Sequence, residues 1–150
     1  MKFVSTRNSK LEVSGAQAVV KGLSEEGGLF VPAFFPEITK ADLDEMRDMS
    51  YDERSAFVIG KYLPELIGDL NEYTKKAYAR FDGDPAPLVM LEEDLGILEL
   101  WHGPTHAFKD IALTLLPYLL TGSKNAIGKT EKTLILVATS GDTGKAALEG

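Results

Sequence analysis

The order of apolar segments after residue 87 constrains the fold of this chain more than any other feature of its sequence. Residues 88–91, 97–101 and 133–138 have the composition of strands, and a strongly apolar helix is predicted at about 107–121. Strands that alternate with helices are typical of an α/β fold with a parallel sheet. Because so few strands and a last helix that stops at Gly150 cannot cover both faces of such a sheet, we expect this domain to be truncated.

Helix signals dominate the region before residue 82. Residues 2–5 alternate in polarity and predict an edge strand. Three helix starts are predicted from capping boxes, in which a hydroxyl side chain and an acid or amide three positions later satisfy free backbone N–H groups. These pairs are Ser14 with Gln17, Thr39 with Asp42, and Ser50 with Glu53. The residues that share one face of a further predicted helix are Leu70, Tyr73, Ala77 and Phe81.

A segment rich in proline and glycine, residues 82–87, separates these two regions. Segments of this composition are typical of linkers between domains. We therefore predict a mostly helical domain at 1–82 and the start of an α/β domain at 88–150.

Composition and charge limit the class of function. The chain is 44% hydrophobic and 26% charged, which is typical of a protein that folds around a core. Its formal net charge of −7 argues against nucleic-acid binding and against attraction to anionic membranes. The absence of cysteine excludes disulfides and thiolate metal sites. We predict neither a secretory signal nor a membrane span, and we expect a cytoplasmic protein.

Lys109 is the residue whose placement most favours chemistry. It follows a turn at Gly103-Pro104 and, on a regular helix, would share a face with three leucines. Burial and the positive end of a helix dipole both disfavour an ammonium ion, which is how a lysine becomes an amine that forms a Schiff base. The alternative is a lysine that reaches solvent from a helix start. His102 and His106 lie four positions apart, but the Gly-Pro turn interrupts the helix that a metal pair needs, so no metal site is predicted.

The second candidate site is the turn at 139–144, Thr-Ser-Gly-Asp-Thr-Gly. It follows an apolar strand and precedes a helix, so backbone N–H groups and hydroxyls converge at the positive end of that helix. This arrangement suits a phosphate or a carboxylate, and an ordinary strand–helix turn is an equal alternative. A nucleotide-binding P-loop is disfavoured, because that motif needs glycine where Thr139 stands and Ser or Thr where Ala146 stands.

Together these motifs resemble those of a known family. HGPT at 102–105 followed by AFKD at 107–110 closely resembles the cofactor-lysine motif of threonine synthases. SGDTG at 140–144 resembles the substrate-side loop of the same family. FVSTR at 3–7 and GGLFVP at 27–32 resemble its amino-terminal domain. The resemblance covers essentially the whole chain, in the expected order.

The resemblance implies a pyridoxal-phosphate enzyme of fold type II, in which a mostly helical amino-terminal domain precedes a three-layer αβα cofactor domain. Threonine synthases are carbon–oxygen lyases that convert O-phospho-L-homoserine and water to L-threonine and phosphate, by γ-elimination followed by β-addition of water. In this family the glycine-rich loop for the cofactor phosphate lies further along the chain. We therefore expect these 150 residues to be an amino-terminal part that is inactive alone.

The resemblance also implies roles for particular residues. Lys109 would hold pyridoxal phosphate covalently and later move substrate protons, with Phe108 beside it at the cofactor. The residues that would bind the substrate are Thr105, Ser140, Gly141, Thr143 and Gly144. Asp142 would lie near the cofactor hydroxyl, where related enzymes often carry asparagine. His106 occupies a variable position and is assigned no role.

Three alternatives stay open at this stage. Another fold-type II lyase, such as threonine dehydratase or a cysteine-synthase-like enzyme, is disfavoured by the block before residue 82. A non-catalytic ligand-binding or assembly module is disfavoured by the intact Lys109 motif. A nucleotide-binding α/β protein is the weakest of the three. A homo-oligomer is compatible with the sequence, which does not determine the oligomeric state.

Overall fold

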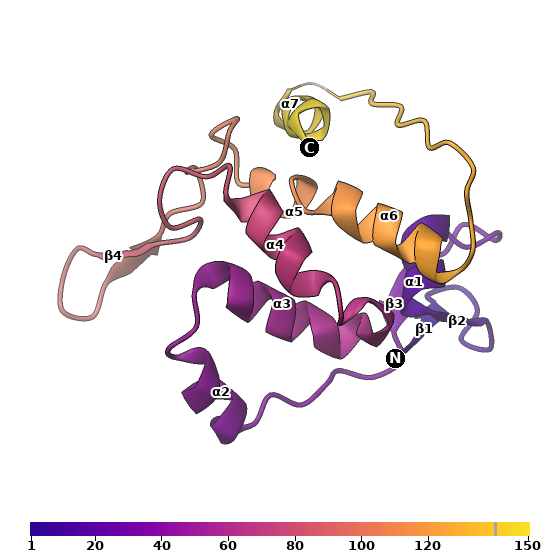
Figure 1. Ribbon diagram of the computed structural model, residues 1–150, viewed down its shortest axis with the longest axis horizontal. Helices are drawn as coiled ribbons and strands as arrows, with labels where there is room; N and C mark the ends of the chain where they lie inside the picture. Colours follow the sequence, from indigo (N-terminus) through magenta and orange to yellow (C-terminus); the bar gives the residue numbers. More distant parts are fainter. Residues whose placement is uncertain (140) are drawn as a thin grey trace.

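The computed structural model describes residues 1–139 and 141–150. A three-stranded antiparallel sheet begins the fold, with strand order β2-β1-β3 (Figure 1). Its strands are β1 (Lys2–Ser5), β2 (Glu12–Ser14) and β3 (Phe30–Pro32). The predicted position of β1 at an edge is wrong, because the chain returns along both of its sides. Phe3 lies opposite Val13 on β2 and opposite Pro32 on β3.

All three predicted capping boxes are present at helix starts. The helices that they open are α1 (Gly15–Lys21), α2 (Lys40–Met46) and α3 (Tyr51–Tyr62). At α1 the box is reciprocal: the Gln17 N–H donates to Ser14 Oγ at 3.1 Å, and the Ser14 N–H donates to Gln17 Oε1 at 2.9 Å. These bonds satisfy backbone donors that the first helical turn leaves free, so a local pattern is enough to set each start.

Two hydrophobic clusters form the core between helices. The core elements that follow α3 are the 3₁₀ turn η1 (Pro64–Leu66), α4 (Leu70–Tyr78) and α6 (Leu116–Ala126). The buried members of the two clusters are Ala56, Leu63, Leu66 and Leu70 in the first and Ala77, Tyr78, Phe81 and Leu115 in the second. Leu119 on α6 packs against both clusters. The predicted apolar face is confirmed on α4, where Leu70 and Ala77 are buried and Tyr73 is partly buried against the second cluster. Phe81, the fourth predicted member, is buried as well but lies beyond the end of α4.

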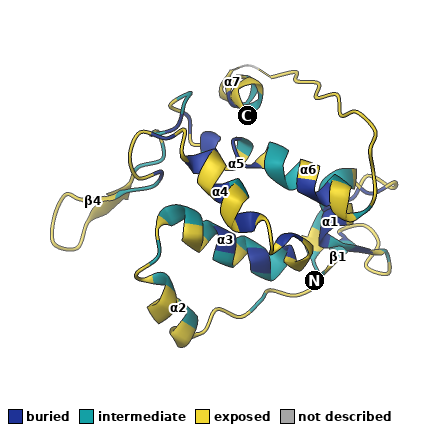
Figure 2. Cartoon of the chain, in the orientation of Figure 1, coloured by how far each residue is buried: buried dark blue, intermediate teal, exposed yellow. Residues whose placement is uncertain are grey.

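The strands after residue 87 do not form the predicted parallel sheet. β4 (Leu88–Met90) and β5 (Gly96–Leu98) pair as an antiparallel hairpin, with Val89 opposite Ile97. Residues 133–138 are extended, but within the described residues no backbone hydrogen bond joins them to a strand. A strand is defined by such bonds to a neighbour, so strand composition alone does not produce one. Figure 2 shows both segments as mostly exposed.

The predicted helix at 107–121 is divided into two. α5 (Asp110–Leu113) is followed by α6, which has Pro117 in its first turn. Pro117 predicts a kink in the helix, because proline lacks an N–H group and its ring clashes with the preceding turn, and the break confirms that kink. α6 packs against α1 and α4, which belong to the first region. The division into domains at 1–82 and 88–150 stays a prediction.

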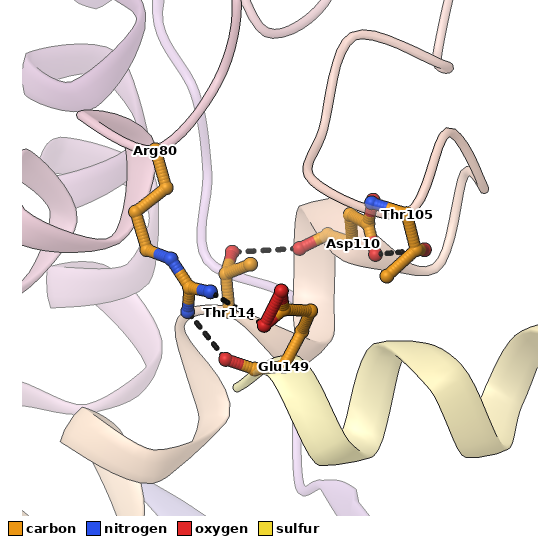
Figure 3. Close-up of polar contacts among 5 residues, drawn as sticks. All are labelled: Arg80, Thr105, Asp110, Thr114 and Glu149. Carbon is orange, nitrogen blue, oxygen red and sulfur yellow. Dashed lines mark hydrogen bonds and ion pairs between the residues drawn. The ribbon is translucent and has the colours of Figure 1, made fainter.

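The last helix, α7 (Asp142–Glu149), packs against α5 and is tied to the first region by an arginine. Arg80, which follows α4, donates to the backbone carbonyl of Glu149 and pairs with Glu149 Oε2 at 3.1 Å (Figure 3). A cation at this end of α7 complements the negative end of the helix dipole. In the described part of the chain, no helix is both long and apolar enough to cross a bilayer.

Candidate functional site

The first candidate motif, residues 102–110, forms a tight turn that leads into α5. The His106 N–H donates to the Gly103 carbonyl at 3.0 Å, and His106 adopts a φ of 58°, which is uncommon for a residue with a side chain. Its Nδ1 lies 3.1 Å from the Trp101 carbonyl, whereas His102 Nε2 lies 2.7 Å from Glu99 Oε2. Each histidine therefore has its own local hydrogen-bond partner.

Lys109 lies at the N-cap position of α5, one residue before the helix. Its side chain is half-buried, and Nζ lies 4.2 Å from the centre of the Phe108 ring. No carboxylate among the described residues lies within ion-pair distance of this amine. The motif therefore presents a primary amine and an aromatic ring side by side, with Phe108 59% exposed.

The predicted apolar face that Lys109 would share with Leu113, Leu116 and Leu120 is not formed. The helix breaks after Leu113, so the three leucines do not continue one face, and Leu116 is exposed. The buried side of α5 carries Asp110 instead, together with Thr114 just after the helix. Sequence spacing assumed a regular helix, and the proline-induced break changes which residues point inward.

Asp110 is the residue of the candidate motif whose burial and contacts sequence reasoning missed. Its side chain is fully buried and accepts two hydrogen bonds from Thr105, one from the N–H at 2.8 Å and one from the hydroxyl at 2.6 Å (Figure 3). A β carbon on residue 103 would lie 2.5 Å from the Asp110 side chain, so Gly103 leaves the room that the carboxylate needs. A carboxylate next to the lysine and five residues after a turn threonine is the signal that could have revealed this contact.

Tyr78 supports α5 from the side of α4. Its hydroxyl donates to the Ile111 carbonyl at 3.2 Å, and its ring meets Tyr51 edge-on at 4.9 Å. Burial raises the pKa of Tyr78 to about 12, because a phenolate at this position would lose its hydration. The helix that follows Lys109 is therefore hydrogen-bonded to a buried tyrosine that stays protonated at neutral pH.

The second candidate motif surrounds the start of α7. Its described members are Gly141, Asp142, Thr143 and Gly144, and the predicted substrate residue Ser140 lies outside the described residues. The Gly141 carbonyl accepts the N–H of Gly144 at 2.9 Å, which closes the first turn of the helix. Asp142 is exposed and pairs with Lys145 at 3.7 Å. Thr143 is half-buried. The N-terminal end of α7 is thus open to solvent.

The structure brings the helices of the two motifs together. α7 packs against α5, and the backbone at Gly150 approaches the carbonyl of Leu113 at the end of α5. Within the described residues, no hydrogen bond or ion pair connects 102–110 directly with 141–144. Contact between the motifs is therefore made through helix packing rather than through the candidate side chains.

The chain is similar to known threonine synthases along its whole length. It is 36% identical to the threonine synthase of Schizosaccharomyces pombe over 100% of the chain, and 38% identical to that of Escherichia coli over 97% of the chain. The matches cover 31% and 33% of those two proteins. The chain thus spans about a third of the length of the curated relatives it matches.

Solved structures give the same result for the fold. The pyridoxal-phosphate-bound threonine synthase of Brucella melitensis matches with a TM-score of 0.90 at 36% identity, over 99% of this chain and 32% of that one. The yeast threonine synthase matches with a TM-score of 0.82 at 36% identity, over 99% and 32%. The predicted fold class, a mixed helix and strand structure like the front part of a fold-type II enzyme, is confirmed.

The family model described as "Threonine synthase N terminus" matches residues 2–78, which is more than half of the chain. The three-stranded sheet and helices α1 to α4 lie within this match. The helix starts set by capping boxes and the first hydrophobic cluster therefore belong to the part that the family model describes. The chain belongs to the threonine synthase N-terminus family.

Proposed function

We propose that the protein to which this chain belongs is a threonine synthase, a pyridoxal-phosphate-dependent lyase that converts O-phospho-L-homoserine and water to L-threonine and phosphate. The observation that carries the proposal is the half-buried amine of Lys109, which lies at a helix start beside an exposed aromatic ring and forms no ion pair among the described residues. Relatives that match the whole chain are threonine synthases, and one of them is described as bound to pyridoxal phosphate.

The residues around Lys109 fit a pyridoxal ring. The exposed Phe108 ring offers an apolar surface, and the amine 4.2 Å from its centre is the group that an aldehyde needs. An amine attacks an aldehyde in its neutral form and forms a Schiff base with it. When bound, the cofactor supplies an electron sink for negative charge that develops beside the substrate α carbon.

Lys109 has a second role in this proposal. With substrate and cofactor bound, the Lys109 amine would lie beside the substrate α carbon and would accept its proton and return it.

The start of α7 is the proposed site for the acidic groups of the substrate. Ser140, Gly141, Thr143 and Gly144 are the proposed substrate-binding residues, because free backbone N–H groups and a threonine hydroxyl at a helix N-terminus favour a carboxylate or phosphate. The N–H of Gly144 itself is engaged by the Gly141 carbonyl, so Gly144 contributes space for the ligand rather than a donor. Asp142 is proposed to accept a hydrogen bond from the cofactor hydroxyl. Thr105 is predicted from the sequence to bind the substrate, but Asp110 engages both of its hydrogen-bond donors. We therefore propose that Thr105 positions the loop that carries Lys109.

Borohydride reduction of the complete, cofactor-loaded protein tests the lysine assignment. We expect the label on the peptide that contains Lys109 and no label in the Lys109→Ala variant. Lys132→Ala, at an exposed position away from both motifs, is the matched control and should be labelled like the parent. A label on any other lysine would reject the proposed site.

Product analysis with O-phospho-L-homoserine tests the reaction. Threonine and phosphate should appear in equal amounts, and phosphate release without threonine would indicate a different lyase. We also propose that residues 1–150 show no turnover alone, since the relatives that carry the activity are about three times longer.

A further inference from the structure

The carboxylate of Asp110 is fully buried, which is uncommon for an acidic side chain. It is 0% exposed, and both of its oxygens accept hydrogen bonds from the same residue, Thr105 (Figure 3). A buried acidic group is stable only when its oxygens find donors. The two bonds, at 2.8 and 2.6 Å, meet that need within one short loop.

The same two bonds decide what Thr105 can offer a ligand. Its N–H and its hydroxyl hydrogen are its two donors, and Asp110 takes both. Only the lone pairs of Thr105 Oγ1 and its carbonyl oxygen remain. The carboxylate and phosphate of a phosphorylated amino acid accept hydrogen bonds and do not donate them when ionised. Thr105 therefore has no donor left for those groups while the contact with Asp110 is intact.

The contact encloses the segment that carries Lys109. Thr105 and Asp110 close a short loop that contains His106 in its positive-φ conformation and the buried Ala107. The Asp110 backbone carbonyl accepts the Thr114 hydroxyl at 2.7 Å, so the first residue of α5 is also tied to the residue that follows the helix. The Lys109 backbone is therefore held between a closed loop and a helix.

Gly103 supports this interpretation independently. A β carbon at residue 103 would lie 2.5 Å from both the β carbon and Oδ2 of Asp110. Such a contact forces one of the two groups to move. The turn therefore has a residue without a side chain at the place where the buried carboxylate needs space.

We propose that Asp110 is a positioning residue for the lysine chemistry. Through Thr105 it fixes the loop that sets the direction of Lys109, and Thr105 serves as the partner of this clasp rather than as a donor to substrate anions. This inference rests on the function proposed above, and it adds a residue and a division of roles within the same site.

Three substitutions in the complete protein separate positioning from substrate binding. Asp110→Ala removes both bonds, and Thr105→Val removes the hydroxyl bond at nearly constant volume. Thr105→Ser keeps the hydroxyl and is the conservative control. We expect Asp110→Ala and Thr105→Val to lower kcat about tenfold or more while KM changes less than about threefold, because a misplaced amine affects chemistry more than binding. Thr105→Ser should restore most of the rate.

The double variant Asp110→Ala/Thr105→Val adds a test of the link between the two residues. If they act through one contact, the double variant should be no slower than Asp110→Ala alone. Independent, multiplying losses would overturn the proposal. A large rise in KM with unchanged kcat in Thr105→Val would overturn it as well, because that result assigns Thr105 to substrate binding.

A measurement without turnover keeps the inference testable if Asp110→Ala folds poorly. Amide hydrogen exchange in the cofactor-free protein should show the Thr105 N–H protected in the parent and in Thr105→Ser. Asp110→Asn can still accept this N–H, so it should keep the protection that Asp110→Ala loses. A Thr105 N–H that exchanges equally fast in the parent and in Asp110→Ala would sink the proposal.

Borohydride labelling distinguishes failure of the proposed function from failure of the positioning role of Asp110. If the parent protein is not labelled at Lys109, the proposed function fails and this inference fails with it. If the parent is labelled but all variants share its kcat and KM, only the positioning role of Asp110 is rejected.

Discussion

The helical region before residue 82 and the extended segments after residue 87 use their leucines in opposite ways. Leu66 and Leu70 are 2% and 1% exposed, whereas Leu134 and Leu136 are 81% and 86% exposed. The difference follows from how each kind of element completes its hydrogen bonds. A helix satisfies its backbone internally and needs only a partner for one face, whereas a strand needs neighbours on its edges before it can bury anything.

Helix α6 comes after residue 87 in the chain but is packed like the helices before residue 82. It follows the candidate lysine in the chain, yet it packs into the core of the first region through Leu119. The loop that carries Lys109 is therefore attached to the well-packed part of the molecule. The β4–β5 hairpin projects away from this part, and the segment after α6 arches back to α7 (Figure 1). The helices of the first region therefore hold the loop that carries Lys109 in place, through α6.

The largest expected effect tests this contrast directly. Leu70→Ala should lower the free energy of unfolding by about 3 to 4 kcal/mol, because a fully buried leucine leaves a cavity. Leu136→Ala is the matched change in the exposed segment 133–138, and it should change the free energy of unfolding by less than about 0.5 kcal/mol. Urea unfolding followed by circular dichroism measures both values. Similar losses in the two variants would contradict the contrast.

A smaller effect is expected from pH, through Tyr78 where α4 meets α5. In the unfolded chain a tyrosine ionises near pH 10, whereas burial raises the pKa of Tyr78 to about 12. The raised pKa means that the stabilising contribution is complete below pH 10 and is lost as pH rises towards 12. The loss is about 2 to 3 kcal/mol by linkage. Unfolding measured across this interval should depend less on pH in Tyr78→Phe, and an unchanged slope would show that this residue is not responsible.

The smallest of these effects concerns a local signal in the first region. Ser14→Ala removes the hydroxyl that accepts the Gln17 N–H at the start of α1, and about 1 kcal/mol of stability should be lost. Ser9→Ala, at an exposed turn position, should leave the unfolding midpoint unchanged. Equal midpoints for the two variants would show that tertiary packing, rather than the capping box, sets this helix start.

Several features of the fold could be predicted from residues that are close in sequence. The three capping boxes and the break at Pro117 depend on contacts a few residues apart. The motif around Lys109 could also be located, because its residue types are informative without knowledge of their neighbours. Its geometry could not be predicted, since the Asp110 contact depends on a turn whose conformation includes a positive φ at His106.

The predictions that failed concern how segments of the chain pair and pack, not which residues they contain. The central place of β1 depends on a segment that returns from residue 30, and the antiparallel pairing of β4 with β5 depends on the path of the hairpin between them. The predicted leucine face beside Lys109 failed because the helix break redirected the side chains. Apolar composition determines that a residue can be buried, and the arrangement of neighbours determines whether it is.

By itself, the sequence determined where helices begin, where one of them must break, and which lysine stands in a motif suited to chemistry. These features depend on backbone donors, proline geometry and side chains within a single turn. Only the tertiary structure decided that Asp110 is buried against Thr105, that α6 closes the core of the first region, and that the last apolar segment has no strand partner among the described residues. Burial and pairing are collective, because each needs surfaces that the chain supplies from elsewhere.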